Sequence, residues 1–378
     1  MDNLVIPVEG LVEKFEAQFT ELKNEIINPN IMILGQTGVG KSSLINTVFG
    51  KDIATIGNTV ATTRGFHKFT DKDIPVNIID SEGYELEKAG EFKEMIEKYI
   101  NVNFDDITKQ IHLAWYCINV SNSRVFQYDI DNLQFLLSKN IPTCVVLTQC
   151  DNDTPEGTYA KSLSQVINDN FKDQISCFQV SNDNELNKSL DLEKLINWSQ
   201  NNLNEENLRL GFIVAQKRNL DLKQEKISTR IKWYGASAAG VAATPIPVSD
   251  APLLVGLQVK MCADIFKIYG LDNNVSGTIK NIIGGEVVSL LGKTLAGNLL
   301  KLIPGIGSVG GALINASVAS SITISMGFAI SKLTKSCIEH KLTGKFIEKL
   351  PVIFNQENLN KLINEFNSKN KKEEDKEN

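Results

Sequence analysis

The stretch "IMILGQTGVGKSS", residues 31–43, decides the fold. Its four apolar residues predict a short buried strand, and its glycine-rich turn is followed by the pattern of a helix. Residues 35–42 fit the spacing G-x-x-x-x-G-K-[ST] of a phosphate-binding loop, the P-loop. Glycines let successive backbone N–H groups turn toward phosphates at the N-terminus of the helix. The stretch therefore predicts an α/β P-loop NTPase domain.

The P-loop also predicts individual roles. Lys41 is expected to reach the β- and γ-phosphates, and the Ser42 hydroxyl is expected to bind Mg²⁺. A glycine-rich turn without a function is a poor alternative, because both the motif and the strand and helix predicted on either side of it fit a P-loop. The candidate phosphate-binding residues are Gly35, Gln36, Thr37, Gly38, Val39, Gly40, Lys41, Ser42 and Ser43.

Two segments downstream extend the predicted site toward the metal. The stretch "VNIIDSEGYE" ends a strand in D-x-x-G, where Asp80 is expected to bind nucleotide and Mg²⁺ and the Gly83 N–H to face the γ-phosphate. The polar stretch "NTVATTRGFH", residues 58–67, is a candidate switch I segment between the two motifs. We expect Thr63 to complete the metal shell, with Thr62 as the alternative. The catalytic candidates are Lys41, Thr63 and Gly83.

The choice of base rests on "VVLTQCD", residues 145–151. The Asp151 carboxylate can accept from both the N1–H and the exocyclic amine of guanine, whereas adenine offers neither donor there. A site built for such hydrogen bonds discriminates strongly, so the sequence predicts GTP and GDP as ligands. The candidate residues at this end are Thr148, Gln149 and Asp151, with backbone contacts from Ser181 and Asn182.

Organisation along the chain predicts two main domains. Between residues 30 and 205, five apolar runs ("IMIL", "VNIID", "HLAWYCINV", "TCVVLTQC", "CFQVS") alternate with helical segments, which predicts a mainly parallel sheet with helices on both faces. An amphipathic helix is expected within residues 1–29, and an all-α domain within residues 206–366, starting with a long helix over 206–234. The charged residues 367–378 predict a disordered tail.

Taken together and in this order, these motifs resemble the Era-like branch of translation-factor-class GTPases, over residues 30–185. The "TTR" at residues 62–64 is typical of that branch. The resemblance implies GTP hydrolysis with Mg²⁺. Three departures stand out: Gln149 replaces the usual lysine, Tyr84 lies where Ras-type enzymes keep a water-orienting glutamine, and Gly38 replaces the asparagine of potassium-activated relatives. We therefore expect modest affinity and slow hydrolysis without a partner.

The C-terminal half resembles the YcjF-type helical domain of unknown function, which is often associated with membranes. The resemblance lies in residues 236–271 and 301–330, with an Ala/Gly run, a Pro-x-Pro break, a Met-containing apolar helix and an Ile-Pro-Gly-Ile-Gly turn in order. It informs architecture, because it carries no catalytic signature.

Lipid contact and a water-soluble bundle are both open for this half. A basic cluster precedes the aromatic pair Trp233-Tyr234, a combination suited to a membrane surface. Residues 311–330 have nearly the length of a span and no polar face. Their small polar side chains and glycines, however, equally suit close packing inside a soluble bundle. The basic cluster comprises Arg209, Lys217, Arg218, Lys223, Lys226, Arg230 and Lys232.

Composition and charge limit which classes of function and location the sequence can support. The 378 residues are 42% hydrophobic and 22% charged with net charge −6, so no global basic field indicates nucleic acid. Six scattered cysteines lack the spacing of a metal or disulfide framework. The N-terminal residues do not form a signal peptide. We expect a cytoplasmic protein, peripheral or integral at a membrane if lipid contact holds.

The sequence thus predicts a GTP-binding protein whose slow, Mg²⁺-dependent hydrolysis couples nucleotide state to a helical, membrane- or partner-binding domain. The alternative is a dynamin-like assembly scaffold that shapes membranes and is activated by homodimerisation of the GTP-binding domain. A third hypothesis is an ATPase, for which Asp151 would not decide nucleotide preference.

Overall fold

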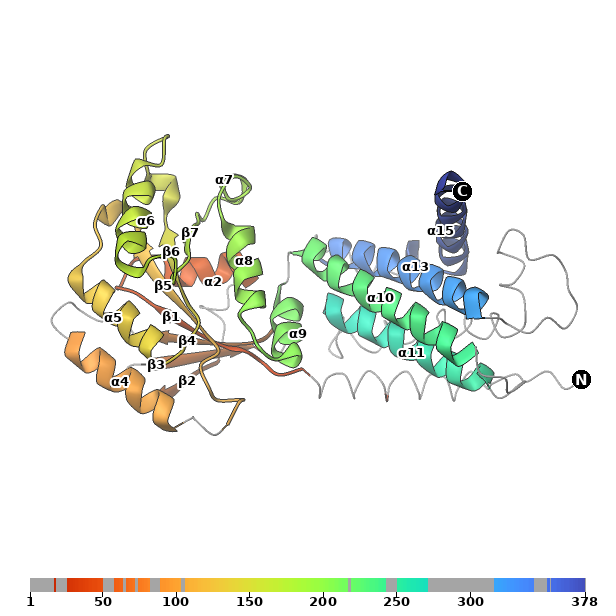
Figure 1. The fold of residues 1–378 in the computed structure, drawn as a ribbon, viewed down its shortest axis with the longest axis horizontal. Coiled ribbons are helices and arrows are strands. Elements are labelled where there is room, and N and C mark those ends of the chain that lie inside the picture. The colour runs from red at the N-terminus through yellow and green to blue at the C-terminus, as the bar shows by residue number, and fades with distance from the viewer. Residues whose placement is uncertain are drawn as a thin grey trace, which may run out of the picture. The chain divides into compact units, whose positions relative to one another are not determined.

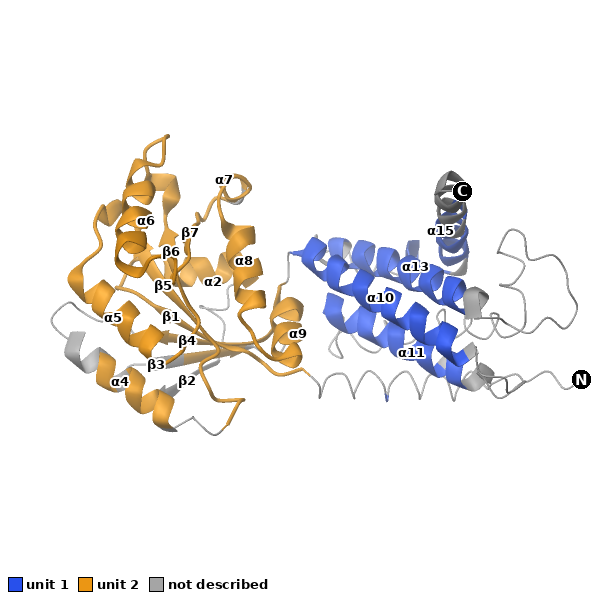
Figure 2. Cartoon of the chain, in the orientation of Figure 1, with its two compact units in different colours: residues 1–25, 219–378 blue, residues 26–218 orange. Residues whose placement is uncertain are grey.

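The computed structural model describes residues 17, 26–49, 58–63, 66–71, 74–81, 89–102, 106–216, 219–242, 250–270, 316–342, 352–353 and 355–377. The chain divides into two compact units (Figure 2). Residues 26–218 form the first, here called the α/β unit, and residues 1–25 with 219–378 form the second, the helical unit. All the predicted nucleotide motifs fall within the α/β unit.

A seven-stranded sheet forms the centre of the α/β unit, in the order β2-β3-β4-β1-β5-β6-β7 (Figure 1). Its strands are β1 (Asn30–Leu34), β2 (Asn58–Thr63), β3 (Phe66–Asp71), β4 (Ile74–Ser81), β5 (Leu113–Asn119), β6 (Thr143–Thr148) and β7 (Cys177–Gln179). The five strands predicted from apolar runs are all present and pair in parallel. The polar strands β2 and β3 were not predicted; they pair antiparallel at the edge.

Helices cover both faces of this sheet, as the alternation of strands and helices predicts. One apolar cluster joins β1, β4, β5 and β6 to the helices α4 (Ala89–Val102), α5 (Gln127–Ser138) and α6 (Thr158–Phe171). The opposite face carries α2 (Lys41–Phe49), α8 (Leu192–Asn201) and α9 (Glu206–Ala215). Short α7 (Asn184–Asn187) follows β7. Successive strand residues point to opposite faces of the sheet, and helices cover both faces, so the central strands are buried on both sides.

Trp115 of β5 organises the second face. Its ring stacks on Phe49 of α2 with a centroid separation of 6.1 Å, and Phe49 meets Phe212 of α9 edge-on at 6.0 Å. The indole N–H donates to the Ser199 hydroxyl over 3.1 Å, so the polar atom of this buried ring is satisfied. These contacts fix α2, and with it the end of the P-loop, against the sheet.

The long helix predicted over residues 206–234 is wrong. It is two helices, α9 and α10 (Leu220–Ala242), and α9 belongs to the α/β unit. A Cβ on Gly211 of α9 would lie 2.4 Å from the Ile27 carbonyl oxygen, so α9 packs directly on the chain entering β1. The α/β unit accordingly extends to residue 218 rather than 205.

The described part of the helical unit contains α10, α11 (Asp250–Tyr269), α13 (Ala316–Leu342) and α15 (Gln356–Glu377). Pro252 lies in the first turn of α11, where its missing N–H costs no helical hydrogen bond. The charged residues 367–377, expected to belong to a disordered tail, are described as the last turns of α15, which continues to Glu377. Its lysines and glutamates are good helix formers.

Helix α13 contains most of the stretch that resembled a span. From residue 319 to 331 no side chain is exposed, as the absence of a polar face predicts. Its polar groups find partners on α11: Gln258 donates to the Thr323 hydroxyl over 3.1 Å, and Tyr269 and Ser331 share a hydrogen bond of 3.2 Å. Protein therefore surrounds this segment. Among the described residues, no helix has the length and apolar character needed to cross a membrane.

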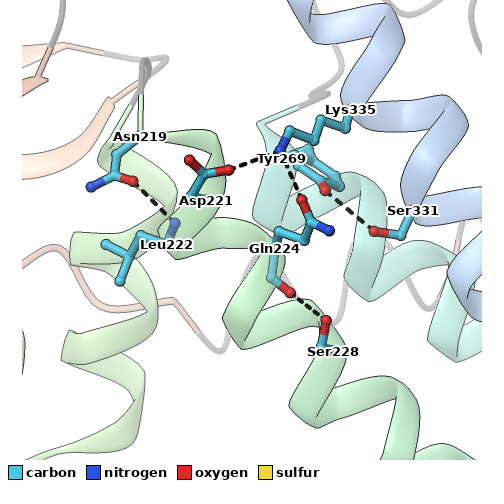
Figure 3. A network of polar contacts seen from close by, with 8 residues as sticks. All are labelled: Asn219, Asp221, Leu222, Gln224, Ser228, Tyr269, Ser331 and Lys335. Atoms are coloured by element: carbon cyan, nitrogen blue, oxygen red, sulfur yellow. Dashed lines mark hydrogen bonds and ion pairs between the residues drawn. The ribbon is translucent and has the colours of Figure 1, made fainter.

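A polar network joins one end of α10, α11 and α13 (Figure 3). Asn219 caps α10 by accepting from the Leu222 N–H over 3.0 Å. Lys335 of α13 donates to Asp221 and to Gln224 of α10 over 2.9 and 2.8 Å. The three helices are thus tied together where α10 begins.

The basic cluster is not a continuous solvent-facing patch. Lys223 is 1% exposed and donates to the Tyr269 carbonyl over 3.5 Å, while Arg230 pairs with buried Asp264. The aromatic pair is split: Trp233 is 60% exposed, but Tyr234 is buried and donates to Asp264 over 2.8 Å. Helical periodicity turns residues 223, 230 and 234 toward the bundle interior.

Several expectations fall outside the described residues. Of the N-terminal helix only Ala17 is described, as helical, while residues 26–29 are not helical. There the Ile27 N–H donates to the Asn207 carbonyl over 3.4 Å. The turn at residues 301–315 and residue Gly83 also lie outside the described residues.

Candidate nucleotide site

The P-loop leaves β1 at the carboxyl edge of the sheet with three glycines in the left-handed region. Gly35, Gly38 and Gly40 have φ of +135°, +81° and +94°. A Cβ on Gly35 would lie 2.5 Å from the Cys117 carbonyl oxygen of β5. Glycine is therefore required at this position by both backbone conformation and close approach.

Lys41 and Ser42 open helix α2, as the motif predicts. Lys41 is 8% exposed, and its Nζ donates to the carbonyls of Gly35 and Gln36 over 3.0 and 3.1 Å. These bonds hold the ammonium inside the curve of its own loop. Ser42 is exposed in the first turn of α2, and Ser43 beside it is half-buried.

Thr148 and Gln149, predicted to lie at the base end, contact the P-loop itself. The Thr148 hydroxyl donates to the Val39 carbonyl, and Gln149 Nε2 donates to the Gly38 carbonyl over 3.1 Å. Because the C=O and N–H of a trans peptide point in opposite directions, fixing these carbonyls also fixes the N–H groups of the loop. The end of β6 thus orders the phosphate-binding backbone.

Asp151 lies beside the other predicted base contact. The Ser181 hydroxyl donates to Asp151 Oδ1 over 2.7 Å, and Asn187 of α7 fixes the Ser181 backbone by accepting from its N–H at 2.9 Å and donating to its carbonyl at 2.6 Å. Gln149 just before has φ +57°, which turns the chain into the short 3₁₀ helix η3 (Cys150–Asn152). The Asp151 and Asn182 side chains are exposed to solvent and therefore accessible to a ligand.

The metal side is described in part. Asp80 lies at the end of β4, opposite Ile33 of β1 in the sheet register. The candidate switch threonines, Thr62 and Thr63, lie at the end of β2, where Thr63 pairs with Phe66 of β3. The segment expected to contact the metal is therefore part of an edge strand in this structure.

The charges of Lys41 and Asp80 both act on the buried thiol of Cys117. Burial raises the pKa of Cys117 to about 12, while the Lys41 charge lowers it and the Asp80 charge raises it. Cys117 lies beneath the P-loop and is a core residue. The candidate ligands for Mg²⁺, a hydroxyl and a carboxylate, suit an ion that takes few protein ligands and keeps phosphate oxygens and water. The described residues contain no cluster of three acidic, histidine or cysteine ligands that would suit another metal.

Sequence reasoning missed three residues that order this site: Asn119, Tyr128 and Asn187. Asn119 and Tyr128 hydrogen-bond Gln149 and Gln36, respectively. Asn119 ends a parallel strand, and polar residues at that edge are a signal that the motif search did not use.

Comparison with known proteins assigns the family. Residues 30–149 match the family of 50S ribosome-binding GTPases. The probable GTP-binding protein EngB of Streptococcus equi subsp. equi (strain 4047) is 30% identical over 156 residues, which are 40% of this chain and 74% of that protein. The chain belongs to this family. Its α/β unit is a GTP-binding GTPase domain.

Two further relatives and one solved structure are similar to parts of this chain. EngB of Aquifex aeolicus (strain VF5) is 29% identical over 143 residues, covering 36% of this chain and 74% of that protein. GTPase Era of Clostridium botulinum (strain Eklund 17B / Type B) is 29% identical over 146 residues, covering 38% and 47%. A solved structure of a probable GTP-binding protein engB is 19% identical and covers 46% of this chain and 98% of that chain, with a TM-score of 0.32. The Era-like resemblance is confirmed for the GTPase domain; the family match ends at residue 149, so the YcjF-type resemblance stays a prediction.

Proposed function

We propose that this protein hydrolyses GTP slowly with Mg²⁺ and uses its nucleotide state to control how the helical unit engages a membrane or a protein partner. The observation that carries the proposal is the link between base end and phosphate end, because Gln149 donates to Gly38 of the P-loop two residues before Asp151. One ligand with a guanine and a polyphosphate would occupy both ends.

The proposed roles follow the geometry. Lys41 would leave the Gly35 and Gln36 carbonyls for the β- and γ-phosphates, which are stronger acceptors for an ammonium. Ser42 and Asp80 would hold Mg²⁺, which neutralises phosphate charge. Thr63 and Gly83 would respond to the γ-phosphate, which for Thr63 requires the end of β2 to rearrange.

Slow hydrolysis follows from what the site offers the attacking water. Tyr84 occupies the position of the water-orienting glutamine of Ras-type enzymes and cannot orient water in the same way. The proposed nucleotide site also relies on a neutral Gln149 where the related motif has a cation. Slow hydrolysis lengthens the GTP-bound state, as a switch requires, whereas the neutral Gln149 is expected to lower the affinity for nucleotide.

Coupling to the helical unit is supported by chain continuity. Helix α9 packs on the sheet and ends at Ala215, and α10 begins at Leu220. The first turns of α10 are tied to α13 through Lys335. The two units are thus adjacent along the chain, and a change that reaches the start of α10 would act on α13 as well through Lys335.

Two measurements test this proposal. The first compares binding and hydrolysis of GTP and ATP by the full chain, with Lys41→Ala as the inactive reference; equal use of both nucleotides would contradict a guanine site. The second is co-sedimentation with anionic liposomes in GDP and in a non-hydrolysable GTP analogue. If the protein stays in the supernatant under every condition, membrane binding is excluded and a protein partner is the remaining alternative.

Protein concentration separates a switch from a dynamin-like assembly. For a switch, turnover per molecule stays constant as the protein is diluted. A turnover number that rises with concentration would support homodimerisation of the GTPase domains instead.

A further inference from the structure

A segment outside the sequence motifs, residues 119–128, enters the nucleotide site between two of them. It connects β5 to α5, starting with the 3₁₀ helix η2 (Val120–Asn122). In the sheet, β5 lies between β1 and β6. The segment therefore begins between the P-loop, which follows β1, and the Thr148–Asp151 loop, which follows β6.

The first contact of this segment runs through Gln149. Asn119 Nδ2 donates to Gln149 Oε1 over 3.0 Å, and Gln149 Nε2 donates to the Gly38 carbonyl over 3.1 Å. Asn119 Oδ1 accepts from the Ser121 N–H at 2.8 Å, which fixes the orientation of the Asn119 amide. The result is a directed chain of hydrogen bonds from β5 to the P-loop.

The second contact reaches the P-loop from the other end of the segment. The Tyr128 hydroxyl accepts a hydrogen bond from Gln36 Nε2. Gln36 and Gly38 flank Thr37, so the two contacts hold the outermost part of the P-loop on both sides of one residue.

The segment itself is firmly anchored. The buried Asp129 carboxylate accepts from the Phe126 N–H over 2.9 Å and from the Tyr116 hydroxyl over 2.8 Å. The Tyr128 ring stacks on Phe126 with centroids 5.2 Å apart, and the Arg124 guanidinium covers Phe126 at 4.4 Å. These contacts limit the movement of Tyr128.

We propose that Asn119 and Tyr128 are positioning residues that clamp Gln36–Gly38 of the P-loop for phosphate binding. The inference rests on the proposed nucleotide site. A loop whose glycines have positive φ loses much conformational entropy when it orders, and contacts that order it beforehand reduce that loss on binding. Because GDP and GTP use the same loop, the clamp affects the affinity for both and leaves the chemical step unchanged.

The clamp also gives a reason for Gln149 in place of lysine. An amide can accept from Asn119 and donate to Gly38 at once, whereas an ammonium has three donors and no acceptor. A lysine at position 149 could reach Gly38 but would meet the Asn119 amide donor. Asn119 and Gln149 therefore act as a matched pair.

A charge-exchange experiment tests the matched pair. Affinity for a fluorescent GDP is measured for the wild type, Asn119→Asp, Gln149→Lys and the double variant. Each single variant is expected to bind about fivefold more weakly, and the double variant to return to within about twofold, because aspartate accepts from lysine and can still cap Ser121. The proposed pairing would be contradicted if Gln149→Lys bound GDP as tightly as the wild type. It would also be contradicted if the double variant bound GDP no more tightly than Gln149→Lys.

Tyr128→Phe tests the other side of the clamp. Loss of the hydroxyl is expected to raise KM for GTP and Kd for GDP by about fivefold, with kcat within about twofold. The matched control is Tyr159→Phe, which removes the hydroxyl of a 41% exposed tyrosine on α6 and should change neither constant. Unchanged KM and Kd in Tyr128→Phe, or a fall confined to kcat, would contradict a positioning role.

The failures are distinguishable. If the wild type binds guanine nucleotides no better than Lys41→Ala, the nucleotide site itself is wrong. If the wild type binds and the clamp variants bind equally well, only the clamp is wrong. Thermal unfolding of each variant without nucleotide identifies any loss that comes from misfolding.

Discussion

The Ser181 hydroxyl donates a 2.7 Å hydrogen bond to the Asp151 carboxylate, joining the loops that follow β6 and β7. The same hydroxyl accepts from the Asp183 N–H over 3.0 Å, so its proton is directed at Asp151. This relationship fixes the carboxylate that we expect to select the base. It also means that the selectivity of the site depends on two loops 30 residues apart.

Asp151→Asn should change nucleotide preference from GTP toward XTP. An amide can donate to the 2-oxo group of xanthine, whereas a carboxylate accepts from the 2-amino group of guanine. Mismatched buried hydrogen bonds are costly, so we expect GTP affinity to fall at least about 100-fold. Competition of GTP, XTP and ATP against a fluorescent nucleotide measures the change.

Asp183→Asn is the matched control for that variant. Asp183 caps α7 by accepting from the Glu185 N–H over 2.8 Å, and asparagine is an equally good cap. Nucleotide preference should stay as in wild type. A shift toward XTP in the control, or retained GTP preference in Asp151→Asn, would contradict the role of Asp151.

Gly35→Ala should abolish nucleotide binding. Its Cβ would lie 2.5 Å from a backbone oxygen of β5, at a φ of +135°, and backbone cannot yield as a flexible side chain does. Gly157→Ala also has positive φ, +66°, but its Cβ meets nothing within 4 Å. The control should lose about 1 kcal/mol of unfolding free energy and keep its GTP affinity. Equal affinities for the two variants would count against the close packing of the P-loop on β5.

His112 should make the α/β unit less stable in mild acid. Burial lowers its pKa to about 4, and its Nδ1 accepts from the Asn30 N–H over 2.8 Å, which requires the neutral ring. The unfolded chain takes up a proton below about pH 6.5, whereas the folded chain does so only near pH 4. Stability is therefore full above pH 6.5 and falls between pH 6.5 and 4, by about 3 kcal/mol at most.

Urea unfolding across this pH window measures the effect. His112→Asn removes the titrating group, so its unfolding free energy should fall less steeply between pH 6.5 and 4 than that of the wild type. Parallel profiles for the two chains would show that His112 does not carry the dependence.

Arg230→Met should destabilise the helical unit by about 3 kcal/mol, because it leaves the carboxylate of Asp264 buried without its cation. The Asp264 side chain is 2% exposed, and Tyr234 remains its hydrogen-bond donor. Replacing both charges in Arg230→Met/Asp264→Asn should recover part of the loss, because the asparagine carries no charge and its amide oxygen can still accept from Tyr234. Urea unfolding of the wild type, the single variant and the double variant measures these differences. A double variant less stable than Arg230→Met would contradict the cost assigned to the unpaired Asp264 carboxylate.

The sequence predicted those parts of the fold that local chemistry determines. Gly35, Lys41 and Asp151 were predicted as site residues because phosphate and base recognition demand those residue types at those spacings, and their roles in binding stay predictions. The parallel strands were found because strands buried on both faces are continuous apolar runs. Strands β2 and β3 were missed because their residues are largely polar and lack the continuous apolar run by which the other strands were predicted; they pair antiparallel, β3 with the neighbouring β4.

Other errors came from tertiary context. Helix α9 was merged with α10 because both are helical; tertiary contacts, Gly211 against Ile27 and Phe212 against Phe49, assign α9 to the α/β unit. Lys223 and Arg230 looked like a surface charge cluster, but their partners Tyr269 and Asp264 come from α11. Such pairings cannot be read from one helix alone.

The hydrogen bonds of α13 have a mechanical consequence. Gln258 pairs with Thr323 and Tyr269 with Ser331, in the same order along both helices, so α11 and α13 run in the same direction with two fixed points. Sliding one helix by a turn, about 5.4 Å, would break both bonds at once and leave polar groups buried. A movement within this unit that keeps both hydrogen bonds therefore carries α11 and α13 together.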